Sequence, residues 1–294
     1  MRVRAFAKIN RSLRVLGTRG DGYHELRTIF QSIALHDTLT IRATRGPFTL
    51  TCDDPACPVD DTNLIARAAV AMWQAAGRRG ASRGVAIDLK KRIPMQAGLG
   101  GGSSDAAAAL RALAKRWRVA DEKGRDAAAA LGADVPYFFE GGAVLGLERG
   151  DLLFPLVDPP SAWVVLVLPD FGVSTKDAFG WFDERAGFST RLRAGIRVGH
   201  YSTADPRVSR SPEMVNDLAG PVVARHPEIG RIISALGRSG ASQAAMSGSG
   251  SAVFGLFSTR SAAIQAEKQL ASANRRVVAT RTVGRKTYRR LAAT

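Results

Sequence analysis

The chain has 294 residues, of which 45% are hydrophobic and 23% are charged. This length and composition indicate a globular protein with one large or two ordinary domains, and they argue against intrinsic disorder. No run approaches the roughly 18 uninterrupted apolar residues of a membrane helix, and the first residues lack the apolar region of a secretory signal, so we expect a cytoplasmic protein without a membrane partner. Its two cysteines, Cys52 and Cys57, favour two reduced thiols over a disulfide or half a metal site.

The net charge is strongly positive. Lysine and arginine number 42 against 26 acidic residues, which gives a formal charge of +16. Such an excess is typical of proteins with anionic partners, either nucleic acid or an acidic small ligand. However, 34 of the 42 basic residues are arginines and alanine is also abundant, a pairing that a GC-rich genome can produce. Since the basic residues are spread along the chain, we expect an acidic small ligand and no nucleic acid.

The first third of the chain predicts several strands and one helix. Residues 3–17 alternate and are rich in Val, Ile and Leu, and the glycines and aspartate that follow predict a turn into a second strand. Alternation predicts further strands at residues 34–44 and 48–52. Residues 60–77 predict a helix that begins at Asp and Thr cap residues and ends at Gly77.

A strand, a glycine-rich loop and a helix follow in that order. Residues 84–94 place Val85, Ile87 and Leu89 on one face of a strand that ends at Pro94. After the glycines, apolar residues recur at helical spacing from residue 110 to residue 117. The helix is expected to begin at residues of the types that cap helices: Ser103, Ser104 and Asp105.

The glycine-rich loop, residues 98–104, predicts a phosphate site. The first turn of a helix leaves backbone N–H groups unpaired and carries a partial positive charge, and glycines let that backbone approach a ligand closely. Two common phosphate motifs do not fit, because the loop lacks the Lys-Ser/Thr ending of a Walker motif and has Ser103 where the dinucleotide fingerprint needs glycine. The alternative is a plain linker, but the run is longer and denser in glycine than a turn requires.

Three motifs in chain order resemble the GHMP kinase superfamily of galactose, homoserine, mevalonate and phosphomevalonate kinases. They are AKIN at residues 7–10, PMQAGLGGGSSDAAAAL at residues 94–110 and AMSGSGSAVFGLF at residues 245–257. The resemblance implies an ATP-dependent kinase in which the glycine loop holds the phosphates of ATP, accompanied by Mg²⁺ whose protein ligands it does not identify. The residues that it places beside ATP are Asn63, Pro94, Gly98, Leu99, Gly100, Gly101, Gly102, Ser103 and Ser104. Asn63 could equally cap its helix.

Further segments resemble one branch of this superfamily. They are GDGYHEL, IFQSIALHD, DTNLIARAA, LGADVPYF and NDL, and the resemblance covers nearly the whole chain, most weakly at residues 183–213. In this branch a hydroxyl of a cytidyl-diphosphate sugar alcohol is phosphorylated for isoprenoid precursor synthesis. Two alternatives stay open. One is another small-molecule GHMP kinase, and the other is a basic RNA-binding protein, because the N-terminal fold of the superfamily also occurs in a ribosomal protein.

The resemblance also assigns roles within the site. Asp134 matches the catalytic base, and Lys8 matches the lysine beside it, which is expected to stabilise the carboxylate and the charge that develops during transfer. Read without the resemblance, Asp134 is a helix cap and Lys8 an exposed lysine at a strand end. The expected substrate contacts are Asn10, Tyr23, His24, Phe179 and Gly248. Trp181 is the alternative to Phe179 as a second aromatic that stacks on cytosine.

The implied fold class is α/β, in a two-layer α+β arrangement. We expect a ribosomal-protein-like ATP-binding domain at residues 1–158 and a ferredoxin-like domain at residues 159–294, with the active site in the cleft between them. The segment at residues 183–211 has no assigned role. The oligomeric state is not predicted.

Overall fold

The first layer of the protein is a six-stranded sheet. The computed structural model describes residues 1–186 and 215–292. The strand order is β3-β4-β2-β5-β6, and β1 pairs with β2. The strands are β1 (Arg2–Thr18), β2 (His24–Pro47), β3 (Thr49–Cys52), β4 (Arg83–Lys90), β5 (Ala143–Glu148) and β6 (Leu152–Pro155). The turn predicted after residue 17 is confirmed. The strand predicted at residues 34–44 is also confirmed, but it is not a separate strand, because β2 runs through that segment without a break.

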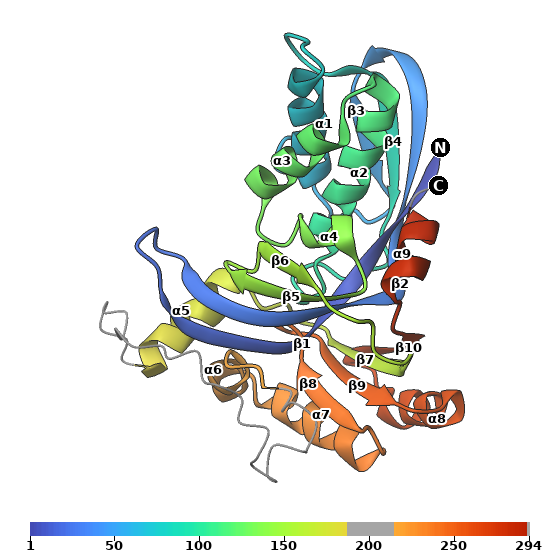
Figure 1. Ribbon diagram of the computed structural model, residues 1–294. Coiled ribbons are helices and arrows are strands. Elements are labelled where there is room, and N and C mark those ends of the chain that lie inside the picture. The colour runs from blue at the N-terminus through green and yellow to red at the C-terminus, as the bar shows by residue number, and fades with distance from the viewer. Residues whose placement is uncertain (187–214, 293–294) are drawn as a thin grey trace.

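Helices cover one face of this sheet. They are α1 (Leu64–Ala75), α2 (Gly101–Trp117), α3 (Asp121–Leu131) and the short α4 (Tyr137–Glu140). Figure 1 shows α1, α2 and α3 side by side along β3 and β4. Val85, Ile87 and Leu89 are buried on the same face of β4, as predicted, and they pack against the apolar side of α2. Because α2 carries mainly alanine there, it packs close to its neighbours.

The second layer is a four-stranded antiparallel sheet in the order β10-β7-β9-β8. Its elements are β7 (Trp163–Pro169), α5 (Thr175–Ala186), α6 (Ala219–Arg225), α7 (Pro227–Arg238), β8 (Gln243–Met246), β9 (Val253–Phe257), α8 (Arg260–Leu270) and β10 (Arg275–Arg281). One face packs on α7 and α8, which lie away from the first layer in Figure 1. The other face, which includes Leu166 and Phe254, packs on Ile9 and Ile33 of the long strands β1 and β2. The long β1–β2 hairpin therefore belongs to both layers.

The last helix, α9 (Arg285–Ala292), returns to the first layer. Its Tyr288 is buried and donates a hydrogen bond of 2.6 Å to the carbonyl oxygen of Phe138. The backbone N–H of Arg285 donates to the Asp158 carboxylate at 2.6 Å. The chain after residue 158 thus contributes a helix to the first layer, and the predicted division between residues 158 and 159 stays a prediction.

Two helix starts differ from the sequence-based expectation. Helix α2 begins at Gly101, with Gly100 in the left-handed conformation at the N-cap and no side-chain cap, so the predicted cap at residues 103–105 is wrong. The physical reason is that candidate cap side chains are engaged elsewhere, since the Ser104 hydroxyl donates to the carbonyl oxygen of Phe6 and Asp105 pairs with Lys91. Helix α1 is capped by Asn63, whose side chain accepts the N–H of Ile65 at 2.8 Å, and not by the Asp or Thr before it, so the alternative capping role of Asn63 is confirmed. In the described part of the chain, no helix combines the length and hydrophobicity of a membrane span.

Candidate active site

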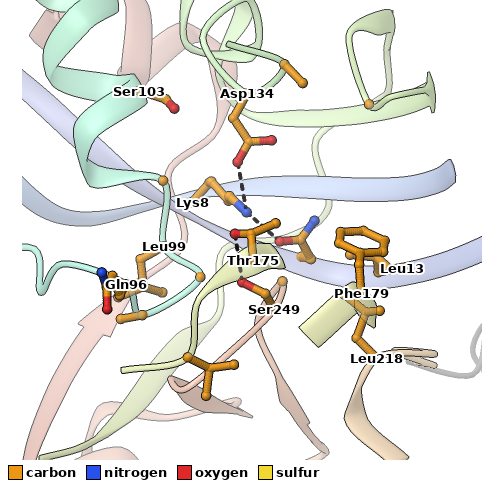
Figure 2. A pocket seen from close by; sticks show the side chains of 18 of the residues that line it. Lys8, Leu13, Gln96, Leu99, Ser103, Asp134, Thr175, Phe179, Leu218 and Ser249 are labelled. Atoms are coloured by element: carbon orange, nitrogen blue, oxygen red, sulfur yellow. Dashed lines mark hydrogen bonds and ion pairs between the residues drawn. The ribbon is translucent and has the colours of Figure 1, made fainter. Parts of the chain in front are cut away.

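A cavity of about 940 Å³ opens between the two layers. Strands β1 and β2, the glycine loop, the start of α5 and the turn at residues 247–250 all contribute to its lining. Figure 2 shows Lys8 at its centre, with Asp134 on one side and Phe179 at one end. The sequence elements that were predicted to act together therefore meet in one place.

Lys8 is held firmly by its surroundings. Its backbone N–H donates to the carbonyl oxygen of Leu99 at 3.0 Å, which ties β1 to the glycine loop. Its side chain is 5% exposed, and its Nζ lies 3.3 Å from Asp134 Oδ2 and 2.6 Å from Asn10 Oδ1. Lys8 and Asn10 share a face of β1 because side chains two residues apart point the same way. The Asn10 amide in turn donates to Thr28 Oγ1 at 2.7 Å, so the orientation of its oxygen toward Lys8 is fixed.

Asp134 lies in the turn before α4 and faces the cavity. Its side chain is 34% exposed and pairs with the Lys8 ammonium. The residue at the N-cap of α4 is Pro136, which makes no side-chain cap bond, so Asp134 does not have the capping role that was its structural alternative. Lys8, likewise, is not an exposed lysine at a strand end. A carboxylate oxygen and an ammonium thus face the same space.

The glycine loop is shaped by close backbone contacts. Gly98 and Gly100 have φ values of 72° and 69°, a conformation that disfavours other residues. A Cβ on Gly100 would lie 2.8 Å from the Phe138 ring and 3.1 Å from Lys8 Cε. The predicted ATP contacts that line the cavity are Pro94, Gly98, Leu99, Gly100, Gly101, Gly102 and Ser103. Only glycine lets the loop lie this close to Lys8.

Two of the predicted ATP contacts lie outside the lining. Ser104 is 1% exposed, and its hydroxyl donates to the carbonyl oxygen of Phe6 at 2.7 Å, which fixes α2 to β1. Asn63 uses its side-chain oxygen as the cap of α1, and its amide donates to the carbonyl oxygen of Pro58 at 2.6 Å. Leu64, the next residue, does line the cavity.

Aromatic side chains gather at the other end of the cavity. The rings of His24 and Phe179 stack, with centroids 4.6 Å apart and an interplanar angle of 19°. His24 also contacts the carboxylate of Asp183 at 2.8 Å. Tyr23 lines the cavity with 55% of its surface exposed. Of the two alternatives for a second stacking aromatic, Phe179 lines the cavity, whereas Trp181 packs near His226 in the core of the second layer.

The turn at residues 247–250 forms a further part of the cavity wall. The Ser247 hydroxyl donates to the carbonyl oxygen of Gly98 at 2.9 Å and accepts the N–H of Asn10 at 3.2 Å. Gly248 has a φ of 55° and lines the cavity, and a Cβ there would lie 3.2 Å from Asn10 Oδ1. This turn therefore joins the glycine loop to β1.

Several polar residues of the lining were missed by the sequence analysis: Lys91, Arg149, Thr175, Lys176 and Ser249. Thr175 and Ser249 lie with their hydroxyl oxygens 3.2 Å apart, as Figure 2 shows. The guanidinium of Arg149 lies 5.2 Å from the centre of the Tyr23 ring. The short polar run STK at the start of α5 and the second serine of SGSG were the available signals for three of them. Lys91 and Arg149 carried no such signal.

Among the described residues, no candidate metal centre is apparent from protein side chains alone. Over residues 1–186 and 215–292, no three His, Cys, Asp or Glu side chains are grouped so that they could hold a metal ion.

Comparison with known proteins first identifies the superfamily. The model of the GHMP kinases N terminal domain matches residues 63–142, and that of the GHMP kinases C terminal domain matches residues 207–276. A solved mevalonate kinase from Methanococcus jannaschii shares only 14% identity but superposes with a TM-score of 0.68 over 97% of this chain and 98% of its own, so it shares the fold. The predicted α/β class and GHMP kinase fold are confirmed, and the chain is an ATP-dependent phosphotransferase of this superfamily.

Closer relatives identify the branch. The 4-diphosphocytidyl-2-C-methyl-D-erythritol kinase of Solibacter usitatus (strain Ellin6076) is 43% identical over 90% of this chain and 83% of its own length. That of Desulfitobacterium hafniense (strain Y51) is 40% identical over 90% and 88%. A crystal structure of a 4-(cytidine 5'-diphospho)-2C-methyl-D-erythritol kinase is 35% identical, with a TM-score of 0.77 over 97% of this chain and 100% of that one. The chain belongs to the family of 4-diphosphocytidyl-2-C-methyl-D-erythritol kinases.

Proposed function

We propose that this enzyme transfers the γ-phosphoryl group of ATP to the 2-hydroxyl of 4-diphosphocytidyl-2-C-methyl-D-erythritol, in the methylerythritol phosphate pathway of isoprenoid precursor synthesis. The observation that carries the proposal is the Lys8–Asp134 pair, 3.3 Å apart, in a cavity with a glycine loop at one side and aromatic rings at one end. The names of the relatives support the choice of substrate.

In this proposal Asp134 is the general base. Its carboxylate takes the proton of the attacking hydroxyl, while the Lys8 ammonium stabilises the negative charge that develops on the transferring group. Asn10 keeps the ammonium in place through its 2.6 Å hydrogen bond. Phosphoryl transfer asks a protein mainly for positioning and charge stabilisation, and these three side chains supply both.

The start of α2 is the proposed site of the ATP phosphates. The helix begins at Gly101, no acidic residue lies in its first turn, and residues 94–103 line the cavity beside it. Unpaired N–H groups and the positive end of the helix dipole favour an anion there. The side chains of Asn63 and Ser104 are both engaged in other hydrogen bonds. Direct contact of ATP with either residue stays a prediction.

The aromatic end of the cavity is the proposed site of the cytosine. Stacking of a base on an aromatic ring contributes about 1–3 kcal/mol, and Tyr23 and Phe179 both line this end. His24 lies beside them; its Nε2 contacts the Asp183 carboxylate, and its other ring nitrogen is the one we propose for the base edge. Asn10 and Gly248 also line the cavity, and we place the diphosphate beside them.

We propose that Mg²⁺ accompanies ATP. Magnesium in kinase sites is held by one or two carboxylates together with substrate phosphates and water. When bound, it would neutralise phosphate charge. We also propose a cytoplasmic location and a division into two domains at residue 158.

The test is ATP turnover by the purified protein with magnesium, measured with and without the cytidyl substrate. Asp134→Asn is expected to lower kcat by about 10²- to 10⁴-fold, the usual contribution of a general base. Asp126→Asn is the matched control, because Asp126 is exposed on α3 and away from the cavity. Lys8→Met should lower kcat to a similar extent through loss of charge stabilisation.

The outcomes separate the alternatives. Turnover with another alcohol but not with the cytidyl substrate would replace the substrate assignment and leave the GHMP kinase standing. Full activity of Asp134→Asn would remove Asp134 as the base. RNA binding that weakens steeply with salt, without any turnover, would favour the RNA-binding alternative instead.

A further inference from the structure

A buried cluster of three charged side chains lies behind the glycine loop. Lys91, just after β4, places its Nζ 2.5 Å from Asp37 Oδ2 and 2.9 Å from Asp105 Oδ2. The three side chains are each at most 5% exposed. Taking charged groups out of water opposes folding unless they are well paired. The proposed transfer reaction uses none of the three, so the cluster needs another role.

The cluster connects the two ends of the glycine loop. Asp37, in the middle of β2, accepts the backbone N–H groups of Arg92 at 2.5 Å and Ile93 at 2.8 Å with its second oxygen. This fixes the chain just before Pro94, a few residues ahead of the glycine loop. Asp105 lies on α2, just after the loop ends. Lys91 bonds to both carboxylates, so it joins the segment before the loop to the helix after it.

The cluster also reaches the cavity. Lys91 contributes to the cavity lining. A Cβ on Gly101, the first residue of α2, would lie 3.3 Å from Lys91 Nζ and 3.0 Å from Ile93 Cγ2. The cluster and its backbone contacts therefore determine where the N-terminus of α2 lies relative to the cavity.

The two carboxyl groups are not equivalent. Asp37 accepts three hydrogen bonds, whereas Asp105 accepts one from Lys91 and its Oδ1 has no partner within the described residues. The other titratable group that faces Asp105 is the Cys57 thiol, whose pKa burial and a hydrogen bond with Cys52 raise to about 12, so it is neutral. One ammonium with two ionised carboxylates would leave a net negative charge in the interior.

A proton on Asp105 removes that net charge. Burial raises the pKa of Asp105 to about 8, and the charge of Asp37 acts in the same direction against the attraction of Lys91. Asp37, with three donors, is the better place for the negative charge. The arrangement of donors and the burial of the cluster agree on the same assignment.

We propose that Lys91, Asp37 and Asp105 form a positioning cluster that fixes the glycine loop and the start of α2 for nucleotide binding, with Asp37 as the counter-charge of Lys91 and Asp105 as its neutral hydrogen-bond acceptor. The proposal rests on ATP occupying the glycine loop, as proposed above. An asparagine at position 105 is neutral and keeps an acceptor oxygen, so it can replace the aspartic acid. An alanine cannot.

The cluster also predicts a pH dependence of stability. Because the pKa of Asp105 is raised on folding, the folded protein holds a proton that the unfolded chain releases above its ordinary value of 3.8. Stability therefore falls as pH rises from about 4 toward about 8, since the folded state binds more protons in this window. The Asp105→Asn variant lacks this titrating group, so the melting temperature of the variant should fall less as pH rises over the same range.

The experiment compares the full-length protein with Asp105→Ala, Asp105→Asn and Asp37→Asn. Asp88→Asn is the matched control. Asp88 lies on β4, the strand that leads to Lys91, but it pairs with Arg42 on the exposed face of the sheet. The Kd of ADP with magnesium is measured by calorimetry, and the melting temperature is measured without ligand between pH 5 and pH 9. Neither readout requires the sugar substrate.

We expect Asp105→Ala to weaken ADP binding about tenfold, as for loss of a hydrogen bond to a charged group, and Asp105→Asn to restore it to within about threefold. Asp37→Asn should weaken ADP binding at least as much as the alanine variant, and Asp88→Asn should bind like the unaltered protein. The melting temperature of Asp105→Asn should depend less on pH than that of the unaltered protein.

Three results would overturn the proposal. Asp105→Ala that binds ADP normally would show that the cluster does not position the loop. Asp105→Asn that binds as poorly as Asp105→Ala would make Asp105 a required counter-charge. An equal pH dependence of the melting temperature in Asp105→Asn and the unaltered protein would mean that Asp105 is ionised. If the unaltered protein fails to bind ADP, the proposed ATP site fails instead, which is visible without any variant.

Discussion

Gly98 is where the glycine loop comes closest to the turn at residues 247–250, and Gly98→Ala tests that contact. Gly98 has a φ of 72°, and an added Cβ would lie 2.0 Å from the carbonyl oxygen of Ser247 and 3.1 Å from the backbone nitrogen of Gly250. Ordinary contacts of a Cβ begin at 3.4 Å, and the atoms it would meet belong to the backbone. No side chain can turn away, so the loop and the turn must separate, which breaks the hydrogen bond from Ser247 Oγ to Gly98.

The free-energy cost of the steric clash can be separated from that of the backbone conformation by comparison with a matched glycine. Gly77 has a φ of 73°, and a Cβ there would meet nothing within 4 Å. Alanine in this left-handed conformation costs about 1–2 kcal/mol, and Gly77→Ala measures that cost alone. Gly98→Ala adds the lost hydrogen bond, about 1 kcal/mol, and the separation of two packed segments, so the total should exceed about 3 kcal/mol.

Thermal unfolding and ATP turnover are the assays. With about 2–4 °C per kcal/mol, Gly77→Ala should lower the melting temperature by about 2–8 °C. Gly98→Ala, at more than about 3 kcal/mol, should lower it by at least about 6–12 °C. Turnover should fall only in Gly98→Ala. Equal melting temperatures for the two variants would refute the steric reasoning, and full turnover of Gly98→Ala would refute the importance of the contact for catalysis.

Two further predictions concern the substrate end and the packing of α9. Phe179→Ala should raise the KM of the cytidyl substrate about 5- to 150-fold, because about 1–3 kcal/mol of stacking is lost. Trp181→Ala should lower the melting temperature and leave the KM unchanged. A KM effect in Trp181→Ala alone would reverse the assignment of the stacking residue. Although burial opposes it, hydrogen bonds and charges from Arg125 and Arg289 hold the pKa of Glu140 below its usual value. Glu140→Gln should therefore melt below the unaltered protein at pH 7, and the gap should close as pH falls below the ordinary value of 4.5; a gap independent of pH would contradict this pairing.

Local sequence patterns predicted the strands better than the helix starts. Alternation on β4 identified Val85, Ile87 and Leu89 as one buried face, because a period of two residues depends only on the strand itself. The start of α2 could not be read in this way. Glycine has a low helix propensity, so Gly101 and Gly102 were assigned to the loop. In the structure both glycines are helical. Glycine is needed at position 101 because Ile93 and Lys91, which precede the loop, leave no room for a larger side chain, a contact that no local pattern reveals.

The candidate site, too, could be predicted from local sequence patterns only in part. The glycine loop as a phosphate site followed from the chemistry of a helix N-terminus. Lys8 and Asp134 lie far apart in the sequence and were linked by the resemblance alone; the structure places them 3.3 Å apart. Lys91 and Asp37 are 54 residues apart and belong to no quoted motif as a pair. Such a pair is visible only once strands β2 and β4 lie side by side.

The return of α9 to the first layer has a consequence for the order of synthesis on the ribosome. Tyr288 fills the space beside Gly141, where a Cβ would lie 2.1 Å from its ring, and Arg285 donates to the carbonyl oxygen of Ala143 at 2.6 Å. These contacts involve residues translated more than 140 positions apart. In the nascent chain, this surface of the first layer therefore stays uncovered until the second layer has been synthesised. Chaperone binding to stalled chains that lack α9 should be strongest at this uncovered surface, since folding intermediates expose the apolar contacts they have not yet made.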